Sequence, residues 1–364
     1  MKKSILTVVG NRPQFIKMAP VSRALVAHGV AETVVHTGQH YDDKLSAIFF
    51  RELGMKEPEI RLDVEGRSHG AMTGEMLAKL EAVYLERKPK HVLVYGDTNT
   101  TLAAALAAVK LHIKVAHVEA GPRLIERTMP EEFNRVMVDH ISTLLFCADE
   151  ASVANLKKEN LTRGVILTGD VMLDAFNLFS AEAATKSTLL QNPKLKDGFA
   201  FMTLHRPANV DDEASLRRLL GFIGRIPSVV LFPVHLRTRA RLEEFGLRAA
   251  FDALPNLILA EPLGYLDTVA ALTACDSVLT DSGGLQKEAY YAGKTSVVLQ
   301  DETPWPDLRD SQWLYVAGTI PNCDPETVLA KLAMPKPKTA PAFYGDGHAA
   351  GIIVRSLEEN GFFN

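Results

Sequence analysis

Short apolar runs rich in β-branched residues alternate along this chain with longer segments of helical period, and this alternation restricts the possible fold more than any other feature. Such runs are typical of strands buried on both faces, and the segments between them are typical of helices that cover a parallel sheet. In the first half we expect strands at 5–9, 32–37, 91–95, 114–118, 144–147 and 165–168, with helices at 15–28, 72–87, 100–111 and 131–139. The pattern predicts an α/β fold.

The same alternation begins again in the second half. Segment 173–196 is helical and then polar, and Asn192-Pro193 and Asp197-Gly198 are turn signals near its end. Strands are then expected at 199–204, 229–234, 257–259, 277–280 and 296–299, and a last helix at 349–360. A chain of 364 residues has the length for about two domains. We therefore expect an amino-terminal domain at 1–172, a carboxy-terminal domain at 173–345, and a segment 346–364 that returns to the first domain.

Composition excludes several classes of protein. The formal charge of −4 without any basic block offers no surface for nucleic acid or an anionic membrane. The three cysteines lie far apart, which argues against a disulfide framework or a CxxC metal site and indicates a reducing compartment. No apolar run approaches the roughly 20 residues that cross a bilayer, and the first one is too short for a signal peptide. We expect a cytoplasmic protein without metal, nucleic-acid or membrane partners.

Polar residues gather in the loops that follow the expected strands. Ligands of open parallel sheets bind beyond the carboxyl ends of the strands, so these loops are where binding groups are expected. They are Gly10-Asn11-Arg12-Pro13, Gly38-Gln39-His40, Gly96-Asp97-Thr98-Asn99, Glu119-Ala120-Gly121, His205-Arg206-Pro207, His235-Leu236-Arg237 and Asp281-Ser282-Gly283-Gly284.

Segment 280–288 predicts a phosphate site. Ser282, Gly283 and Gly284 stand at an expected helix N-terminus, where backbone N–H groups and the helix dipole favour an anion. Glu288 lies one turn deeper, where its carboxylate can accept hydrogen bonds from ribose hydroxyls. A helix cap followed by a tight turn explains the same residues equally well. The chain lacks the glycine motifs of a nicotinamide site and of a P-loop, so we expect no cofactor.

Histidine and arginine follow two other strands of the second domain. His205 with Arg206, and His235 followed by Arg237, put hydrogen-bond donors at the ends of neighbouring strands, which suits a pyrophosphate. A single histidine is more often a structural residue, but two histidines beside arginines favour anion binding.

The first domain supplies acids instead. Asp97 and Glu119 follow two hydrophobic strands, where an unpaired carboxylate is costly, so cationic partners such as Arg12 or Lys17 are expected. Glu131 opens a helix with a second glutamate beside it, and compensation of the helix dipole accounts for one of the two. Acids in one half and phosphate-binding groups in the other suit proton transfer beside a nucleotide leaving group.

Together these loops resemble one family, the non-hydrolysing UDP-N-acetylglucosamine 2-epimerases. The resemblance covers nearly the whole chain. The matching motifs are, in order, segments 10–17, 95–98, 117–121, 129–135, 204–206, 233–235, 280–288 and 344–347. The resemblance implies a GT-B fold, in which two Rossmann-like domains have parallel sheets that face a central cleft.

The resemblance also implies a mechanism. UDP is eliminated anti to the proton at C2 of the sugar and adds back to the resulting glycal with C2 inverted, so no hydride acceptor is needed. Asp97, Glu119 and Glu131 become the acid/base candidates, with Arg12, Lys17 and His205 as supporting groups. Arg206, His235, Ser282, Gly283, Gly284 and Glu288 are the candidates for binding the substrate and its UDP group. The expected partner is a UDP-sugar, and we expect a homodimer.

Some residues resemble a neighbouring branch that acts on UDP-2,3-diacetamido-2,3-dideoxyglucuronic acid. They are Gln14-Phe15 and segments 38–42 and 286–290, whereas Pro122, segment 124–126 and Pro304 depart from both branches. An epimerase of that branch is therefore one alternative. A GT-B glycosyltransferase and a catalytically silent sugar-nucleotide sensor are two more, and the first-domain acids argue against both.

Overall fold

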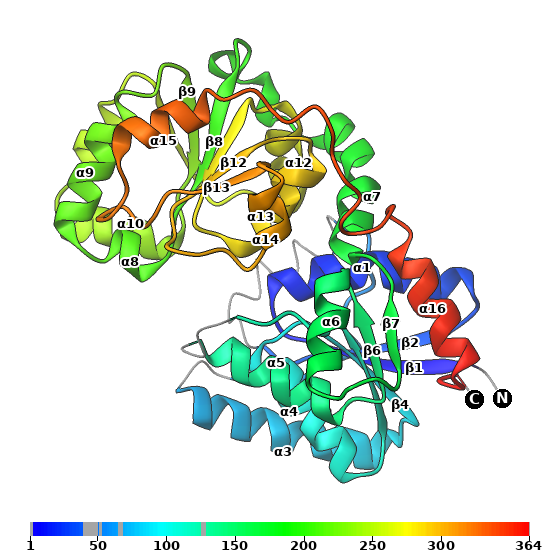
Figure 1. The fold of residues 1–364 in the computed structure, drawn as a ribbon. Coiled ribbons are helices and arrows are strands. Elements are labelled where there is room, and N and C mark those ends of the chain that lie inside the picture. The colour runs from blue at the N-terminus through cyan, green and yellow to red at the C-terminus, as the bar shows by residue number, and fades with distance from the viewer. Residues whose placement is uncertain (1–2, 39–49, 51–52, 65–67, 125–128, 364) are drawn as a thin grey trace. The chain divides into compact units, whose positions relative to one another are not determined.

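The computed structural model describes residues 3–38, 50, 53–64, 68–124 and 129–363 of the chain (Figure 1). It consists of two compact units. Unit 1 comprises Met1–Leu178 and Ala342–Asn364, and unit 2 comprises Phe179–Pro341. The divisions fall at 178/179 and 341/342, whereas the sequence suggests 172/173 and 345/346. The first division lies inside one helix, α7 (Val171–Lys186).

Unit 1 is built on a parallel sheet, which has seven strands within the described residues, in the order β3-β2-β1-β4-β5-β6-β7. The strands are β1 (Ser4–Val9), β2 (Ala31–His36), β3 (Ile60–Arg61), β4 (His91–Tyr95), β5 (Lys114–Val118), β6 (Leu144–Cys147) and β7 (Val165–Leu167). The strand order reverses between β1 and β4. In such sheets the crevice beyond the carboxyl ends of the strands at this reversal is the usual ligand site.

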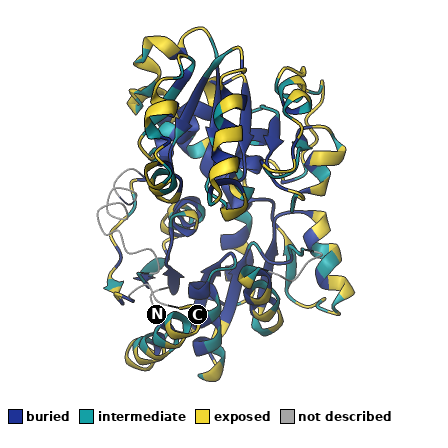
Figure 2. Cartoon of the chain, turned by 90° about the vertical axis from the view of Figure 1, so that its left-hand side faces the viewer, coloured by how far each residue is buried: buried dark blue, intermediate teal, exposed yellow. Residues whose placement is uncertain are grey.

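Helices cover both faces of this sheet. They are α1 (Arg12–Ala27), α3 (His69–Arg87), α4 (Asn99–Lys110), α5 (Pro130–Ile141), α6 (Glu150–Lys158), α7 and α16 (Ala349–Glu359). Helix α4 is rich in alanine, so it approaches β1 and β4 closely. The core joins strand residues such as Val8 and Val94 to Met76 and Leu80 of α3. Figure 2 shows buried strands and helices that expose their outer faces.

The carboxy-terminal segment belongs to unit 1. Asp174 of α7 accepts hydrogen bonds from the backbone N–H groups of Ala349 (3.0 Å) and Ala350 (2.7 Å), which caps α16. Gly169 has a φ of +82°, and a Cβ added there would lie 2.8 Å from the carbonyl oxygen of Tyr344. Glycine is needed at this close approach. Helix α16 then packs against α1.

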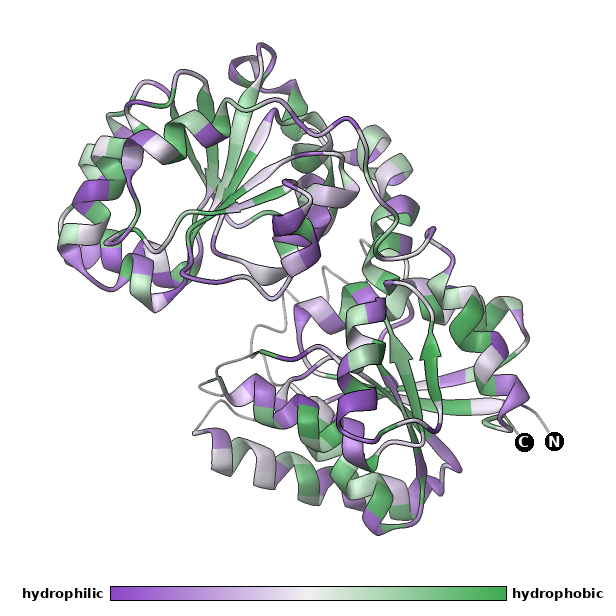
Figure 3. Cartoon of the chain, in the orientation of Figure 1, coloured by the Kyte–Doolittle hydropathy of each residue, from purple (hydrophilic) through white to green (hydrophobic). Residues whose placement is uncertain are grey.

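Unit 2 repeats the architecture with a parallel sheet in the order β10-β9-β8-β11-β12-β13, six strands in this fully described unit. The strands are β8 (Phe199–Thr203), β9 (Val229–Pro233), β10 (Leu257–Ala260), β11 (Ser277–Thr280), β12 (Ser296–Val298) and β13 (Leu314–Val316). The helices are α8 (Pro207–Val210), α9 (Glu213–Ile223), α10 (Leu236–Glu244), α11 (Arg248–Asp252), α12 (Tyr265–Ala274), α13 (Gly283–Tyr291), α14 (Pro306–Asp310) and α15 (Pro325–Leu332). The order reverses between β8 and β11, and Figure 3 shows the apolar strands in the middle of each unit.

Several elements are not predicted by the sequence. Strands β3 and β13 are two and three residues long, too short to leave an apolar run in the sequence, and helix α6 lies where the sequence analysis places no helix. Segment 173–196, predicted to be helical and then polar, is helical to Lys186 in α7, and two 3-10 turns, Leu189–Gln191 and Pro193–Leu195, follow. None of the helices in the described ranges combines the length and the apolar composition that a bilayer crossing requires.

Candidate active site

Gln14 connects the loops that follow β1 and β4 in unit 1. Its buried side chain accepts a hydrogen bond from the N–H of Gly10 (2.7 Å) and donates one to the carbonyl of Tyr95 (2.8 Å). The neighbouring Asn11 caps α1 through its side chain, which accepts the N–H of Gln14 at 3.2 Å. Arg12, the first residue of α1, is therefore held at the reversal of strand order. Sequence reasoning did not find this role for Gln14, because the groups to which its amide donates, on Tyr95 and Thr101, lie more than 80 residues away.

Lys17 and Glu119 form an ion pair in unit 1, and both side chains are 14% exposed. Lys17 is one of the two cationic partners expected from the sequence. Glu119 follows β5 with a φ of +70°, which is uncommon for a residue other than glycine. Its backbone is held there, because the N–H groups of Glu119 and Ala120 both donate to the carbonyl of Phe146 (3.1 and 3.0 Å). A strained backbone of this kind is frequent where a side chain must be aimed.

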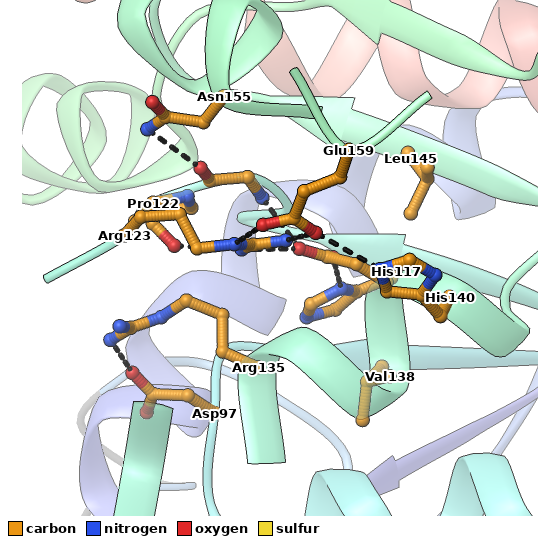
Figure 4. Close-up of polar contacts among 12 residues, drawn as sticks. Asp97, His117, Pro122, Arg123, Arg135, Val138, His140, Leu145, Asn155 and Glu159 are labelled. Carbon is orange, nitrogen blue, oxygen red and sulfur yellow. Dashed lines mark hydrogen bonds and ion pairs between the residues drawn. The ribbon is translucent and has the colours of Figure 1, made fainter. Parts of the chain in front are cut away.

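Asp97 is paired with Arg135 of α5, a residue to which sequence reasoning assigned no role. Arg135 also pairs with Glu132 (Figure 4 shows its contact with Asp97). Burial alone would lower the pKa of the Arg135 guanidinium, but the charges of Asp97 and Glu132 raise it. Asn134 donates to the backbone carbonyl of Asp97 (3.0 Å). Asp97 is thus held by two residues of α5, and its carboxylate has a permanent cation beside it.

The two glutamates that open α5 differ in burial. Glu132 is 1% exposed, pairs with Arg135 and accepts the N–H of Leu124 at 3.2 Å. Glu131 is partly exposed. The structural role expected for one of the pair therefore belongs to Glu132. Arg12, Asp97, Glu119 and Glu131 lie in the loops or helix starts that follow β1, β4 and β5, and Lys17 lies one turn into α1.

Asp281 organises the corresponding edge of unit 2. Its carboxylate is fully buried and accepts the backbone N–H groups of His205 (3.0 Å) and Arg206 (2.8 Å) and the side-chain amide of Asn209 (3.1 Å). The Nδ1 atom of His205 lies 3.1 Å from the same carboxylate. Burial alone would raise the pKa of Asp281, but the His205 and Arg206 contacts and Asn209 lower it below its ordinary value. An ionised Asp281 thus orients His205 and Arg206.

His235 lies beside His205, with ring centroids 5.3 Å apart. It caps α10, because its Nδ1 accepts the N–H of Arg237 at 3.2 Å. The side chain of Arg237, which the sequence suggests as an anion donor, instead donates to Asp211 at 2.8 Å. That ion pair makes Arg237 a weaker candidate than Arg206 for binding an anion.

The start of α13 carries Ser282, Gly283 and Gly284. Ser282 occupies the N-cap position, but its side chain makes no capping hydrogen bond, and Asp281 is engaged with the 205–206 loop. A Cβ added at Gly284 would meet no atom within 4 Å, and at Gly283 the nearest atom, Pro304 Cγ, would be 3.9 Å away. Protein packing therefore does not require glycine at either position. The bare backbone is available to a ligand.

Glu288 lies on α13 and is 7% exposed. Trp305 covers the beginning of the same helix, because its indole N–H donates to the carbonyl of Gly283 at 2.9 Å. Lys287 places its ammonium 4.1 Å from the centroid of the Trp305 ring. The segment around Pro304, which departs from the family pattern, is thus in contact with the predicted phosphate-binding turn.

Known proteins resemble the whole chain. The family model described as UDP-N-acetylglucosamine 2-epimerase matches residues 23–358. The UDP-2,3-diacetamido-2,3-dideoxy-D-glucuronate 2-epimerase of Pseudomonas aeruginosa is 44% identical over 360 residues, which cover 97% of this chain and 99% of that protein. The UDP-N-acetylglucosamine 2-epimerase of Methanocaldococcus jannaschii is 36% identical over 98% of this chain and 99% of its own length.

The chain belongs to the UDP-N-acetylglucosamine 2-epimerase family. A solved structure of the Methanocaldococcus jannaschii UDP-GlcNAc 2-epimerase in complex with UDP-GlcNAc and UDP superimposes with a TM-score of 0.88 at 34% identity, covering 98% of this chain and 99% of that one. The resemblance inferred from the loops is thereby confirmed, as is the GT-B fold class with its two parallel-sheet units. The family is one of isomerases.

Two of the features compared with the family fall partly outside the described residues. Gln39 and His40 of the second loop are in a range that the structure does not describe, as are Ile125 and Glu126. Among the residues that are described, no group of three or more His, Cys, Asp or Glu side chains is placed to hold a metal ion.

Proposed function

We propose that this protein inverts C2 of a UDP-N-acetylhexosamine, converting UDP-GlcNAc to UDP-ManNAc without hydrolysing it. In the first step a base takes the proton from C2, the electrons of that C–H bond form a C1=C2 double bond, and UDP leaves C1 with its bonding pair. In the second step a proton is added to the opposite face of C2 while a phosphate oxygen of UDP attacks C1. No electrons are gained or lost, so the chemistry needs no redox cofactor.

The observation that carries this proposal is the pair of carboxylates held beside cations in unit 1 of a family member: Glu119 with Lys17, and Asp97 with Arg135. Inversion at C2 needs one group that removes a proton and another that delivers one on the other face. A carboxylate paired with a cation is ionised and can act as a base, and the Lys17 ammonium carries protons. Glu131, which is partly exposed, is the third candidate acid.

Unit 2 is proposed to hold UDP. The uncapped start of α13, with its two glycines, supplies backbone N–H groups for a phosphate, and the helix dipole favours the negative charge. Arg206 and His205, both positioned by Asp281, supply further donors. Stabilising the UDP anion matters because the proton at C2 is only weakly acidic and leaves together with the nucleotide.

A second substrate is favoured by one specific observation. The 44% identical relative from Pseudomonas aeruginosa is a 2-epimerase of a diacetamido uronic acid linked to UDP. The same reaction on that sugar is the alternative. Comparing kcat/KM for the two UDP-sugars decides between them, since each tenfold ratio corresponds to about 1.4 kcal/mol of transition-state discrimination. A homodimer and a cytoplasmic location remain predictions.

Deuterium exchange tests the reaction directly. Incubating the protein with UDP-GlcNAc in deuterium oxide, without an acceptor, should yield UDP-ManNAc in which C2 carries deuterium, and recovered UDP-GlcNAc should acquire it as well. Mass spectrometry and proton NMR read out both changes. Product that forms without deuterium would contradict the elimination. Consumption only when an acceptor is added would indicate a glycosyltransferase, and binding without turnover would indicate a sensor.

Replacing Glu288 should weaken UDP itself. We expect Glu288→Ala to cost about 1.5–3 kcal/mol of binding free energy, roughly a 10–150-fold rise in Kd, because a hydrogen bond to a charged group is lost. Titration calorimetry with UDP measures it. Glu243→Ala, which removes an exposed carboxylate from α10 of the same unit, is the matched control. Equal UDP affinity in both variants would remove Glu288 from the nucleotide site.

A further inference from the structure

His117 is a buried histidine that the mechanism above does not use. It lies on β5, is fully buried, and both of its ring nitrogens have close partners. Its Nδ1 lies 2.7 Å from Oδ1 of Asp139 on α5, and its Nε2 lies 2.7 Å from the carbonyl oxygen of Gly96 in the loop after β4. One imidazole therefore joins three elements: β5, α5 and the β4 loop.

These three elements are the ones that carry the candidate acids. Asp97 directly follows Gly96, Glu119 lies two residues after His117, and Glu131 lies in the first turn of α5. A shift of the imidazole would therefore change the spacing among all three carboxylates.

The ring of His117 is held on both sides. A backbone carbonyl only accepts, so Nε2 must donate to Gly96. On the other side Nδ1 lies against Oδ1 of Asp139, and Oδ2 of the same carboxyl group accepts the backbone N–H of Gly121 (3.1 Å) and Nη1 of Arg123 (2.8 Å). The orientation of the imidazole is therefore fixed by β5, α5 and the β4 loop together.

The polar contacts of His117 continue toward the surface. Asp139 also contacts Arg123, which donates to Glu159 through Nε (2.7 Å) and Nη2 (3.0 Å). Burial alone would lower the pKa of Arg123, but its hydrogen bonds to Glu159 and the Asp139 charge raise it. This series of polar contacts reaches the surface at His140, whose Nε2 lies 3.0 Å from Glu159. Buried charges that are paired in this way avoid most of the cost of desolvation.

We propose that His117 is a positioning residue for the epimerase reaction, a buried imidazole that sets the spacing of the loops and helix carrying Asp97, Glu119 and Glu131. The inference rests on the proposed function. Errors of about 1 Å in the placement of reacting groups can reduce turnover by about 10²-fold. Loss of a positioning residue should therefore lower kcat and leave the affinity of unit 2 for the nucleotide unchanged.

Two substitutions separate the two hydrogen bonds. In His117→Asn the side-chain amide takes the place of Nδ1 and keeps the contact with Asp139 but loses the one with Gly96. In His117→Gln the amide reaches the place of Nε2 and keeps the contact with Gly96 but loses the one with Asp139. His140→Asn changes the same residue type at the exposed end of this series of contacts, where the ring lies against Glu159, and serves as the control.

We expect His117→Asn to lower kcat for deuterium exchange at C2 by about 10–100-fold, with KM and the UDP dissociation constant within about twofold of wild type. His117→Gln should retain more turnover than His117→Asn, and His140→Asn should match wild type. Folded His117→Asn with wild-type kcat would overturn the proposal, as would a loss confined to KM. Should His117→Asn not fold, His117→Gln decides by the same split between kcat and KM.

Nitrogen NMR of protein labelled with ¹⁵N-histidine supplies a measurement that does not depend on activity. The His117 signals, identified by their absence from His117→Gln, should show a proton on Nε2, the ring nitrogen that donates to Gly96. A bare Nε2 would mean that the bond to Gly96 is not made, and the proposal would fall. Absence of deuterium exchange at C2 in the wild-type protein would instead contradict the proposed epimerase reaction. The NMR result would still show whether His117 makes its hydrogen bond to Gly96.

Discussion

Glu119→Gln and Asp97→Asn should each lower the rate of C2 exchange by about 10²–10⁴-fold, the usual contribution of a positioned acid or base, while both variants should bind UDP as wild type does. An amide keeps the shape of a carboxylate but cannot take up a proton. Lys17 loses its partner Glu119 in the first variant, and Arg135 loses Asp97 but keeps Glu132 in the second. Glu131→Gln is expected to behave in the same way, because Glu131 is the partly exposed member of its pair.

Proton NMR in deuterium oxide measures the exchange, and calorimetry with UDP measures the binding. Glu86→Gln, on the exposed face of α3, provides a carboxylate control, since its side chain is 74% exposed. Thermal melts identify any variant whose loss of rate comes from unfolding. Full activity in folded variants at all three acid positions would refute their assignment. A single active variant would narrow the acid/base pair to the other two positions.

Asp281→Ala should remove about 3–5 kcal/mol from the free energy of unfolding of unit 2, the range measured when one partner of a buried ionic network is deleted. The substitution leaves the N–H groups of His205 and Arg206 and the amide of Asn209 without their buried acceptor. Leu299 still accepts from Asn209, and Asn209 still accepts the N–H of Ile320, so that side chain keeps two of its three bonds. Asp281→Asn keeps one acceptor oxygen and should lose less.

Both tryptophans of the chain, Trp305 and Trp313, lie in unit 2, so their fluorescence during urea unfolding reports on the unit that contains Asp281. Asp310→Ala removes an exposed carboxylate from the same unit and should cost less than about 1 kcal/mol. Wild-type unfolding energy in Asp281→Ala would show that the hydrogen bonds of this carboxylate contribute nothing.

The loss of folding stability at acid pH should depend in part on the same carboxylate, Asp281. The pKa of Asp281 is lower in the folded chain than in the unfolded chain, so the unfolded state binds the proton first as the pH falls. The stabilisation by Asp281 is therefore complete above its ordinary pKa, near pH 4, and is lost as the pH falls through the folded value. Asp281→Asn should lack this part of the acid dependence. An unchanged acid profile in that variant would contradict the lowered pKa.

Much of the fold could be predicted from the sequence because the signal is local. Strands β4, β5 and β11 have the bounds expected from their apolar runs, since each run is buried on both faces and needs no distant information. Strands β3 and β13 could not be found in this way. Their few residues become strands only through hydrogen bonds to β2 and β12, which lie elsewhere in the chain.

The sequence by itself also determined the family, because motif after motif occurs in the expected order. It determined which loops carry acids and which carry anion-binding groups, since those loops follow strands whose carboxyl ends share an edge. What it left open is which side chains meet. The structural glutamate of the pair opening α5, the cation beside Asp97 and the partners of Gln14 are set by contacts between segments far apart in the chain.

Tertiary structure alone decided the roles of Asp281 and His117. In the sequence Asp281 reads as a helix cap, yet its carboxylate is turned toward a loop 76 residues earlier, where two backbone N–H groups need an acceptor. In the sequence His117 is one residue of a hydrophobic strand, and only the fold brings Asp139 and the Gly96 carbonyl to its two ring nitrogens. Hydrogen bonds and desolvation depend on distances of a few ångströms, and a sequence pattern does not contain those distances.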